Sequence, residues 1–156
     1  MRFHLIAVGT RMPSWVTAGY QEYARRLPHE CTLHLMEIPP CKRRKTLSVA
    51  RIKEAEGRQI LAAVPEPACV VAMDAAGSAW DTPTLASRMQ GWMHDGRDIC
   101  LLVGGPDGLS QDCLERADIR WSLSAHTLPH ALVRVIIAEQ IYRAWTILAG
   151  HPYHRS

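Results

Sequence analysis

The sequence predicts an α/β fold with a mostly parallel sheet flanked by helices. Short apolar segments typical of strands alternate with longer segments of helical periodicity along the whole chain. The apolar segments are nearly continuous, as in strands that are buried on both faces. The length of 156 residues, with 47% hydrophobic and 21% charged residues, is that of one globular domain, which we expect to span residues 1–156.

The expected elements follow one another in regular alternation. Five strands are expected at residues 3–9, 31–38, 69–74, 99–104 and 119–124. Five helices are expected at residues 14–27, 48–64, 83–94, 110–117 and 130–149. Two helix starts have chemical signals, because residues 81–83 (Asp-Thr-Pro) offer a polar cap followed by proline, and Ser110 can cap the next helix. This order favours a doubly wound arrangement.

Composition and charge exclude several classes of protein. No apolar run approaches the roughly 20 residues of a membrane helix, and the first residues do not resemble a signal peptide, so we expect a cytoplasmic protein without a membrane partner. The five cysteines are an odd number without C-x-x-C spacing, which indicates a reducing compartment and no metal site. The net charge of +3 is small, but residues 42–45 form a basic run. Such a run is either a solvated loop or a phosphate contact.

A glycine-rich segment at residues 104–108 (Gly-Gly-Pro-Asp-Gly) follows the fourth expected strand. Ligands of open α/β sheets bind at the carboxyl ends of strands, where glycines let backbone N–H groups approach them. The same residues are also typical of a tight turn, so both interpretations stay open. The segment lacks the glycine spacing of phosphate loops and of dinucleotide-binding loops, which argues against nucleotide hydrolysis and nicotinamide chemistry.

The last expected helix carries one charge that its apolar face does not explain. Helical periodicity places Arg134 on a stripe with Ala138, Ile141, Trp145 and Leu148. A buried guanidinium needs an anionic partner. That partner is either a structural Asp or Glu, or else a carboxylate or phosphate of a ligand or an active site.

The remainder of this helix and the tail that follows it suggest an interface and a reactive group. The helix is apolar nearly all round, which predicts a second covering layer and therefore a homodimer. Glu139, Arg143 and Thr146 share another side, where Glu139 and Arg143 are spaced for a solvated ion pair. In the tail, Tyr153 and His154 are candidates for proton handling or substrate contact, although a merely docked tail is the other interpretation. The chain has no G-x-S-x-G elbow, so covalent catalysis is not favoured.

Ten segments of the chain, taken in order, resemble the family of ribosomal RNA large subunit methyltransferase H, which belongs to the SPOUT class of S-adenosylmethionine enzymes. They are residues 7–10, 42–43, 80–83, 96–98, 104–110, 122–124, 127–130, 132–134, 139–144 and 151–155. The resemblance covers the whole chain and is therefore specific. It implies a homodimer and a deep trefoil knot in the C-terminal region, with the cofactor bound among the knotted loops, a topology that general folding rules disfavour.

The resemblance also implies an activity. The expected reaction is methylation of N3 of a pseudouridine in 23S ribosomal RNA with S-adenosyl-L-methionine, on the assembled ribosome because no appended RNA-binding domain is visible. Two other interpretations stay open: a ribosome-binding module of the same fold without catalysis, and a SPOUT enzyme that methylates tRNA.

Cofactor contacts follow from the same resemblance. They are expected from Met73, Gly104, Leu123, Ser124, Ala125, His126, Thr127 and Leu128. Met73 replaces a leucine of the family, which conserves volume. His126 stands where a small or apolar residue is usual, so its side chain is expected to point away or to alter the pocket.

The substrate side is expected at the end of the chain. The resemblance favours His154 for proton handling, Arg143 for contact with the base or a phosphate, and Tyr153 for positioning. Lys42 and Arg43 are expected to contact RNA phosphates. Arg134 is placed nearby, as an anchor for the substrate side, the cofactor carboxylate or the other subunit. If the subunits pair through the last helix, the tail of one chain reaches the cofactor of the other.

Overall fold

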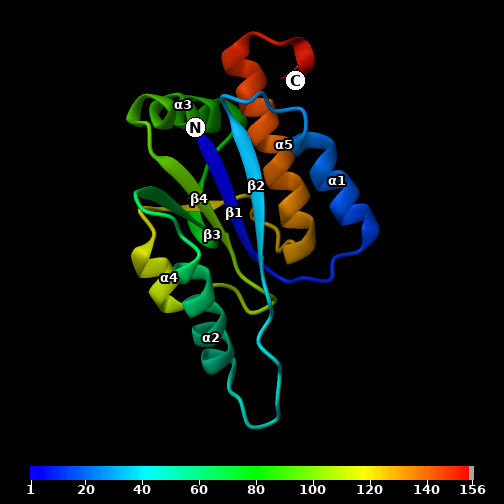
Figure 1. Cartoon of the computed structure of the whole chain (residues 1–156), viewed down its shortest axis with the longest axis vertical. Coiled ribbons are helices and arrows are strands. Elements are labelled where there is room, and N and C mark those ends of the chain that lie inside the picture. The colour runs from blue at the N-terminus through cyan, green and yellow to red at the C-terminus, as the bar shows by residue number, and fades with distance from the viewer. Residues whose placement is uncertain (155–156) are drawn as a thin grey trace.

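The computed structural model describes residues 1–154 and contains a five-stranded sheet in which all neighbouring strands are parallel (Figure 1). The strands are β1 (Arg2–Val8), β2 (Thr32–Ile38), β3 (Ala68–Ala79), β4 (Asp98–Val103) and β5 (Ile119–Ser122). Their order across the sheet is β2-β1-β4-β3-β5. The predicted parallel sheet is confirmed, and the trefoil knot that the resemblance implies stays a prediction.

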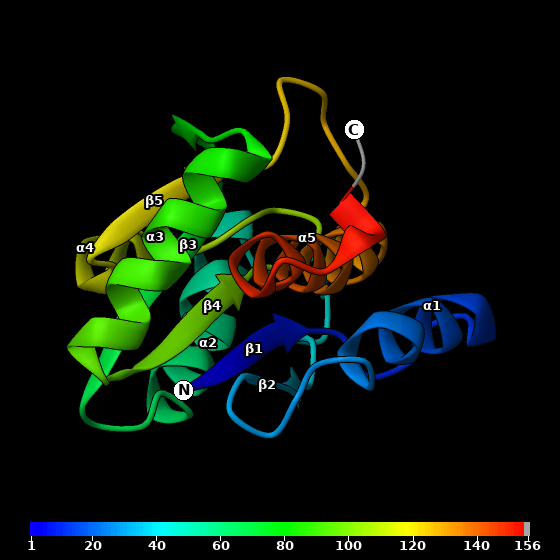
Figure 2. The same ribbon diagram turned by 90° about the horizontal axis from the view of Figure 1, so that it is seen from above.

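Helices cover both faces of this sheet. They are α1 (Ser14–Ala24), α2 (Val49–Ala62), α3 (Thr82–Asp95), α4 (Gln111–Arg116), α5 (His130–Ala149) and the short 3-10 helix η1 (Pro152–His154). Helices α1, α3 and α5 pack on one face, and α2 and α4 pack on the other (Figure 2). The fold is therefore a three-layer α/β arrangement, as the alternation of segments predicts.

Strand β1 shows why the strand segments are continuously apolar. Leu5 belongs to the core under α1, α3 and α5, whereas its neighbour Ile6 belongs to the core under α2 and α4. Both side chains are fully buried. Because successive side chains of a strand point to opposite faces, a strand between two helical layers needs an apolar residue at nearly every position.

Two of the predicted helix caps are confirmed. Asp81 precedes α3, and its Oδ1 accepts a hydrogen bond from the backbone N–H of Thr84 at 2.9 Å. Ser110 precedes α4, and its Oγ accepts a hydrogen bond from the backbone N–H of Cys113 at 3.2 Å. Each bond satisfies a backbone donor that the first turn of a helix leaves without a partner.

Strand β3 is longer than the sequence predicts. The expected strand ends at residue 74, whereas β3 continues to Ala79. Met73 and Ser78 both pair with Trp121, so residues 74–77 bulge out of the ladder. The sequence does not predict this extension because residues 75–79 are small and lack the apolar pattern of the strand before them. The bulge lies beside the carboxyl ends of β4 and β5, where bulges commonly redirect side chains.

Helix α5 is packed on its sheet side but incompletely covered elsewhere. It contacts α1 and α3 and buries Ile137 and Ile141 completely in the core. Leu132, Ile136 and Ile147, by contrast, remain half-buried. No helix in the part of the chain that the structure describes is long and apolar enough to cross a membrane. Because these three side chains are only half-buried, the apolar side of α5 that carries them could be covered by a further protein surface.

Candidate active site

A cavity of about 180 Å³ opens at the carboxyl ends of β3, β4 and β5, and we call it the strand-end cavity. It is lined by Met73, Asp74, Ala75, Val103, Gly104, Gly105, Gly108, Trp121, Ser122, Leu123, Ser124, His126, Thr127, Leu128, His130 and Val133. This is the edge at which open parallel sheets bind their ligands. Its walls are mainly apolar, with a small number of polar groups among them.

The structure brings most of the predicted cofactor residues together in this cavity. Seven of the eight line it, and the exception is Ala125, whose side chain is exposed. The expected cofactor contacts did not include Asp74, Trp121 or His130, which also line it. A signal for His130 was present in the sequence, because it follows the expected cofactor segment directly and opens α5.

The glycine-rich segment is a tight turn that also forms a wall of the cavity. The backbone N–H of Gly108 donates to the carbonyl oxygen of Gly105 at 3.0 Å, and Gly108 has a φ of 85°. A Cβ at Gly104 would overlap the backbone of Gly108 and lie 2.8 Å from the backbone nitrogen of Leu109. Glycine is thus required here because the two ends of the turn touch. The tight-turn interpretation is confirmed, and contact of this segment with a ligand stays a prediction.

Serine hydroxyls hold the segment at residues 122–128. The Oγ of Ser122 donates to the carbonyl oxygen of Ser124 at 3.1 Å. The backbone N–H of His126 donates to the Oγ of Ser124 at 2.9 Å. These bonds are local, so they fix the path of the loop beside the cavity. Side chains of Leu123 and Leu128 supply its apolar surface.

Two polar rings on the wall of the cavity have unusual surroundings. Trp121 stacks on Trp80 with ring centroids 5.0 Å apart, and its buried indole Nε1 has no hydrogen-bond partner within residues 1–154. A buried donor without a partner is uncommon in a folded protein.

His130, also on the wall of the cavity, has a lowered pKa. The main cause is burial of its side chain, and the positive charge of the nearby Arg134 guanidinium adds to it. The imidazole of His130 is therefore favoured in its neutral form.

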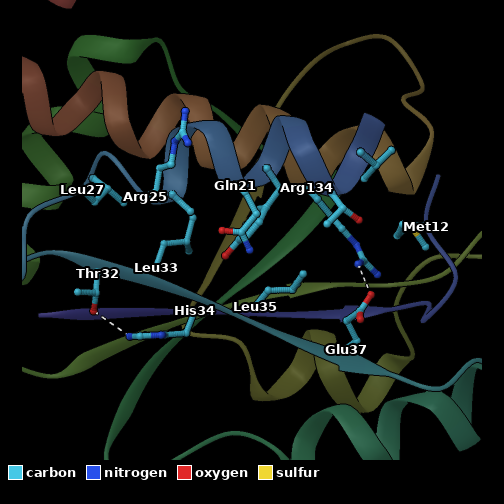
Figure 3. A pocket seen from close by; sticks show the side chains of 14 residues that line it. Met12, Gln21, Arg25, Leu27, Thr32, Leu33, His34, Leu35, Glu37 and Arg134 are labelled. Atoms are coloured by element: carbon cyan, nitrogen blue, oxygen red, sulfur yellow. Dashed lines mark hydrogen bonds and ion pairs between the residues drawn. The ribbon is translucent and has the colours of Figure 1, made fainter. Parts of the chain in front are cut away.

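Arg134 lies in a different place from the cavity lining. Its side chain is 1% exposed, and Nη1 donates to Oε2 of Glu37 on β2 at 2.7 Å. Nη2 donates to the carbonyl oxygens of Val8 and Gly9 at 3.3 and 2.8 Å. Figure 3 shows this ion pair at one end of a groove of about 670 Å³ between α1 and β2. The structural carboxylate is thus the partner found, and a substrate contact by Arg134 stays a prediction.

Three residues predicted for the substrate side, Arg143, Tyr153 and His154, lie toward the other end of α5. Together with Glu139 they form what we call the tail cluster. Nε of Arg143 donates to Oε1 of Glu139 at 2.8 Å, and Nη2 forms an ion pair with the same oxygen at 2.6 Å. The hydroxyl of Tyr153 donates to the same oxygen at 3.0 Å. The expected ion pair is confirmed, but it is partly buried and not fully solvated, since the side chains of Arg143 and Glu139 are only 29% and 17% exposed. The tail folds back on α5 and covers them.

A second cavity, of about 480 Å³, adjoins this cluster, and we call it the tail cavity. It is lined by Thr82, Pro83, Gln140, Arg143, Ile147 and His154. The Nδ1 atom of His154 is buried without a hydrogen-bond partner in the described chain. Burial, and then the hydrogen bond to Glu139, raise the pKa of Tyr153 to about 12. Tyr153 therefore keeps its proton near neutral pH and acts here as a hydrogen-bond donor to Glu139.

The basic loop lies against the glycine-rich turn. Arg43 forms an ion pair with Asp107, which belongs to that turn. The backbone N–H of Cys41 donates to Oε2 of the buried Glu56 at 3.1 Å, which fixes the start of the loop. Lys42 is exposed. The sequence did not predict this contact, because Arg43 and Asp107 are 64 positions apart in the chain.

Metal ligands do not gather anywhere in residues 1–154, where no three His, Cys, Asp or Glu side chains are placed to share an ion. All five cysteines are free thiols.

Comparison with known proteins identifies the class. A family model described as "Predicted SPOUT methyltransferase" matches residues 1–154, so the chain belongs to the SPOUT methyltransferase family. It is 59% identical over 155 residues, 99% of both chains, to a protein of Thioalkalivibrio sulfidiphilus named "Ribosomal RNA large subunit methyltransferase H". It is 57% identical, over the full length of both chains, to a protein of the same name from Alkalilimnicola ehrlichii. The resemblance found in the sequence is thereby confirmed.

A solved structure agrees with the fold. A probable methylase family protein from Haemophilus influenzae matches 99% of this chain and 70% of its own, with a TM-score of 0.57 and 12% sequence identity. At that identity the likeness concerns the fold alone.

Enzymes of this family use S-adenosylmethionine as methyl donor. The chemistry of the strand-end cavity, with apolar walls and a small number of polar groups, suits such a molecule. Met73 and Leu128 offer apolar walls for an adenine ring, and the loops at 104–108 and 122–128 bring backbone groups to the rim. The buried Nε1 of Trp121, which has no partner among residues 1–154, is the type of donor that a bound polar molecule satisfies.

Proposed function

We propose that the chain is a single SPOUT methyltransferase domain that methylates N3 of a pseudouridine in 23S ribosomal RNA on the assembled ribosome. The observation that carries the proposal is the strand-end cavity, where seven of the eight expected cofactor residues meet. Family membership and the shared name of its relatives support the RNA substrate. A ribosomal substrate places the reaction in the cytoplasm, and the loops at 104–108 and 122–128 are where we place the knot.

The reaction requires a methyl donor and removal of one proton. The bound cofactor supplies an electrophilic methyl group on its sulfonium. N3 of the base must lose its proton as the methyl group arrives, and we assign acceptance of that proton to His154. Arg143 contacts the base or its phosphate and steadies developing negative charge, while Tyr153 positions the base. Because alignment of the reacting atoms supplies much of such a rate, the protein acts mainly by orientation.

We further propose that the functional unit is a homodimer in which the tail of one chain meets the cavity of the other. Val133 lines the strand-end cavity and Arg143 lies ten residues further along α5, a separation of about 15 Å at 1.5 Å per residue. Reacting groups must approach to roughly 3–3.5 Å. The cavity is also smaller than the roughly 300–1,000 Å³ of typical ligand sites, so a partner surface would complete it.

The uncovered side of α5 supports this pairing. Leu132, Ile136 and Ile147 are half-buried and lie three or four residues apart from Gln140 and Arg143 along one side of the helix. This stripe runs from the cavity end of α5 to its tail end. A two-fold contact through it would place apolar residues against apolar residues and bring the opposite ends of two helices together.

RNA contact is assigned to Lys42 and Arg43. Both are exposed, and Arg43 pairs with Asp107 beside the strand-end cavity. An exposed ion pair is worth little, so an RNA phosphate can replace Asp107 as the partner of Arg43. The basic loop would then hold the RNA next to the methyl donor.

Methyl transfer from labelled S-adenosylmethionine to ribosomes, with the product nucleoside identified by mass spectrometry, tests the function. The expected product is N3-methylpseudouridine in 23S rRNA. Transfer to tRNA instead would identify a tRNA enzyme, and ribosome binding without calorimetric affinity for the cofactor would identify a non-catalytic module. Either outcome overturns the proposal.

The shared site is tested by mixing two inactive chains. One carries His154→Ala, and the other carries Leu128→Glu, which places a charge in the strand-end cavity. In a mixed dimer one site combines the intact cavity of the first chain with the intact tail of the second, so about half of the normal rate is expected. No recovery in purified mixed dimers would show that each chain uses its own tail.

A further inference from the structure

The Glu139 carboxylate is the point at which the tail cluster converges. Its Oε1 accepts two hydrogen bonds, one from Nε of Arg143 at 2.8 Å and one from the Tyr153 hydroxyl at 3.0 Å, and it forms an ion pair with Nη2 of Arg143 at 2.6 Å. Its Oε2 accepts one from Nε2 of Gln140 at 2.8 Å. A solvated pair on a helix surface has no such set of donors. Hydrogen bonds to an ionised acceptor are stronger and more directional than neutral ones.

This carboxylate is tied to α3 through the amide of Gln140. The hydroxyl of Thr82, the first residue of α3, donates to Oε1 of Gln140 at 2.9 Å. Because that amide oxygen accepts from Thr82, its NH2 group is turned toward Glu139. The Asp-Thr-Pro segment thus does more than start a helix, since its threonine sets the orientation of a side chain on α5.

We propose that Glu139 is a positioning residue of the methyl transfer, which holds Arg143 and Tyr153 in the geometry that meets the RNA base, with Thr82 and Gln140 fixing Glu139 in turn. This inference rests on the proposed function. Arg143 contacts Glu139 through Nε and Nη2, and its side chain also lines the tail cavity. Its guanidinium carbon lies 5.1 Å from the centre of the Tyr153 ring, so the two side chains support each other.

Glu139 also decides the role of the phenol. The hydroxyl of Tyr153 donates a hydrogen bond to the Glu139 carboxylate and keeps its proton, so it does not accept the proton of N3. Burial and Glu139 keep the pKa of Tyr153 far above neutral pH, at about 12. Proton acceptance is thereby left to His154, while Tyr153 serves by its fixed place and its ring.

Docking of the tail does not depend on Glu139 alone. The backbone N–H of His151 donates to the carbonyl oxygen of Thr146 at 2.9 Å, and the rings of Tyr142 and Tyr153 meet edge to face with centroids 4.7 Å apart. Removing the charge of Glu139 should therefore leave the tail in place but loosen Arg143 and the Tyr153 hydroxyl. A positioning role can accordingly be separated from a structural one.

The test is Glu139→Gln in the full-length dimer, measured by steady-state methylation of ribosomes, which gives kcat and KM. We expect kcat to fall about 10- to 100-fold, because small misplacements of aligned groups reduce rates strongly, with KM for ribosomes and calorimetric affinity for the cofactor within about twofold. The control is Asp95→Asn, which neutralises the carboxylate of an exposed ion pair, Asp95 with Arg97, and should leave kcat unchanged. Equal rates for both variants would overturn the proposal.

A double-mutant cycle and a titration complete the test. If Glu139 acts through Tyr153, the loss in Glu139→Gln/Tyr153→Phe should be smaller than the product of the two single losses, whereas strictly multiplicative losses contradict that coupling. Tyrosine ionisation followed by ultraviolet absorbance should show the Tyr153 titration, assigned by its absence in Tyr153→Phe, at lower pH in Glu139→Gln. This readout requires no activity, so an unchanged titration rejects the contact even if the unaltered enzyme methylates no ribosome.

Thr82→Val provides a distant check should Glu139→Gln fold poorly. It removes the hydroxyl that orients Gln140 and touches neither Arg143 nor Tyr153 directly. A loss of about two- to fivefold in kcat is expected, in the same direction and without change in cofactor affinity. A rate equal to that of the unaltered enzyme would reject the link to α3.

Discussion

The strand-end cavity and the tail cluster occupy opposite ends of α5 and are built by different means. The cavity is formed by turns at the carboxyl ends of three strands, and its shape depends on close backbone contacts such as that at Gly104. The tail cluster consists of long polar side chains that converge on Glu139. The difference shows that one chain can build a cavity from backbone turns and, at the other end of the same helix, a cluster from side-chain contacts.

The largest expected effect distinguishes the tail cluster from the cavity. His154→Ala should lower the rate of methyl transfer by about 10²- to 10⁴-fold, because it removes the group assigned to accept the N3 proton. Cofactor affinity, measured by calorimetry, should not change, since His154 does not line the strand-end cavity. His29→Ala is the control, as that side chain is 99% exposed. A rate above one tenth of normal would remove His154 from the mechanism.

The next effect concerns the cavity and its rigid backbone. Gly104→Ala should destabilise the fold by about 1–3 kcal/mol, because its Cβ would overlap Gly108 and the turn must open. Cofactor affinity should fall together with the unfolding free energy, measured by denaturant titration. Gly91→Ala is the matched control, since nothing lies within 4 Å of its Cβ position in α3 and alanine should stabilise that helix by up to about 1 kcal/mol. Equal stabilities of the two variants would contradict this account of the turn.

A smaller effect concerns the basic loop that adjoins the cavity. Arg43→Ala should change the unfolding free energy by no more than about 0.5 kcal/mol, because its pair with Asp107 is exposed. The dependence of ribosome binding on salt should weaken by a slope of about 1 if Arg43 contacts one phosphate. Arg58→Ala, an exposed substitution on α2, should leave that slope unchanged. The same slope for both variants would assign the Arg43 side chain to Asp107 alone.

The smallest expected effect is a pH dependence at the cavity. Burial and Arg134 lower the pKa of His130, so below pH 6.5 the unfolded chain binds a proton that the folded chain does not. The contribution of His130 to stability is therefore complete above pH 6.5 and is lost as the pH falls through its lowered pKa. His130→Asn should flatten the decline in unfolding free energy between pH 7 and 5. A decline as steep as before would place that loss in other groups.

Much of the fold follows from local pattern. The strands at 3–9 and 99–104 and the helix at 130–149 are predicted to within a residue or so, because a buried strand or helix needs apolar side chains at a fixed period. The extension of β3 to Ala79 is missed, since its small residues show no period and are held by pairing with β5. The cofactor segment is predicted by resemblance, and Ala125 is the one member that points elsewhere.

The sequence by itself determined the alternation of strands and helices, two caps, the glycine turn and the family, because these depend on neighbouring residues or on motifs preserved in order. Only the tertiary structure decided which charges meet. Arg134 forms an ion pair with Glu37, 97 positions away in the sequence, and Arg43 forms one with Asp107, 64 positions away. Glu139 looks like half of a surface pair until the tail brings Tyr153 to it. The partner of a long polar side chain depends on which groups the folded backbone brings close to it. The periodicity of the sequence reports only on neighbouring residues, so it does not predict such pairs.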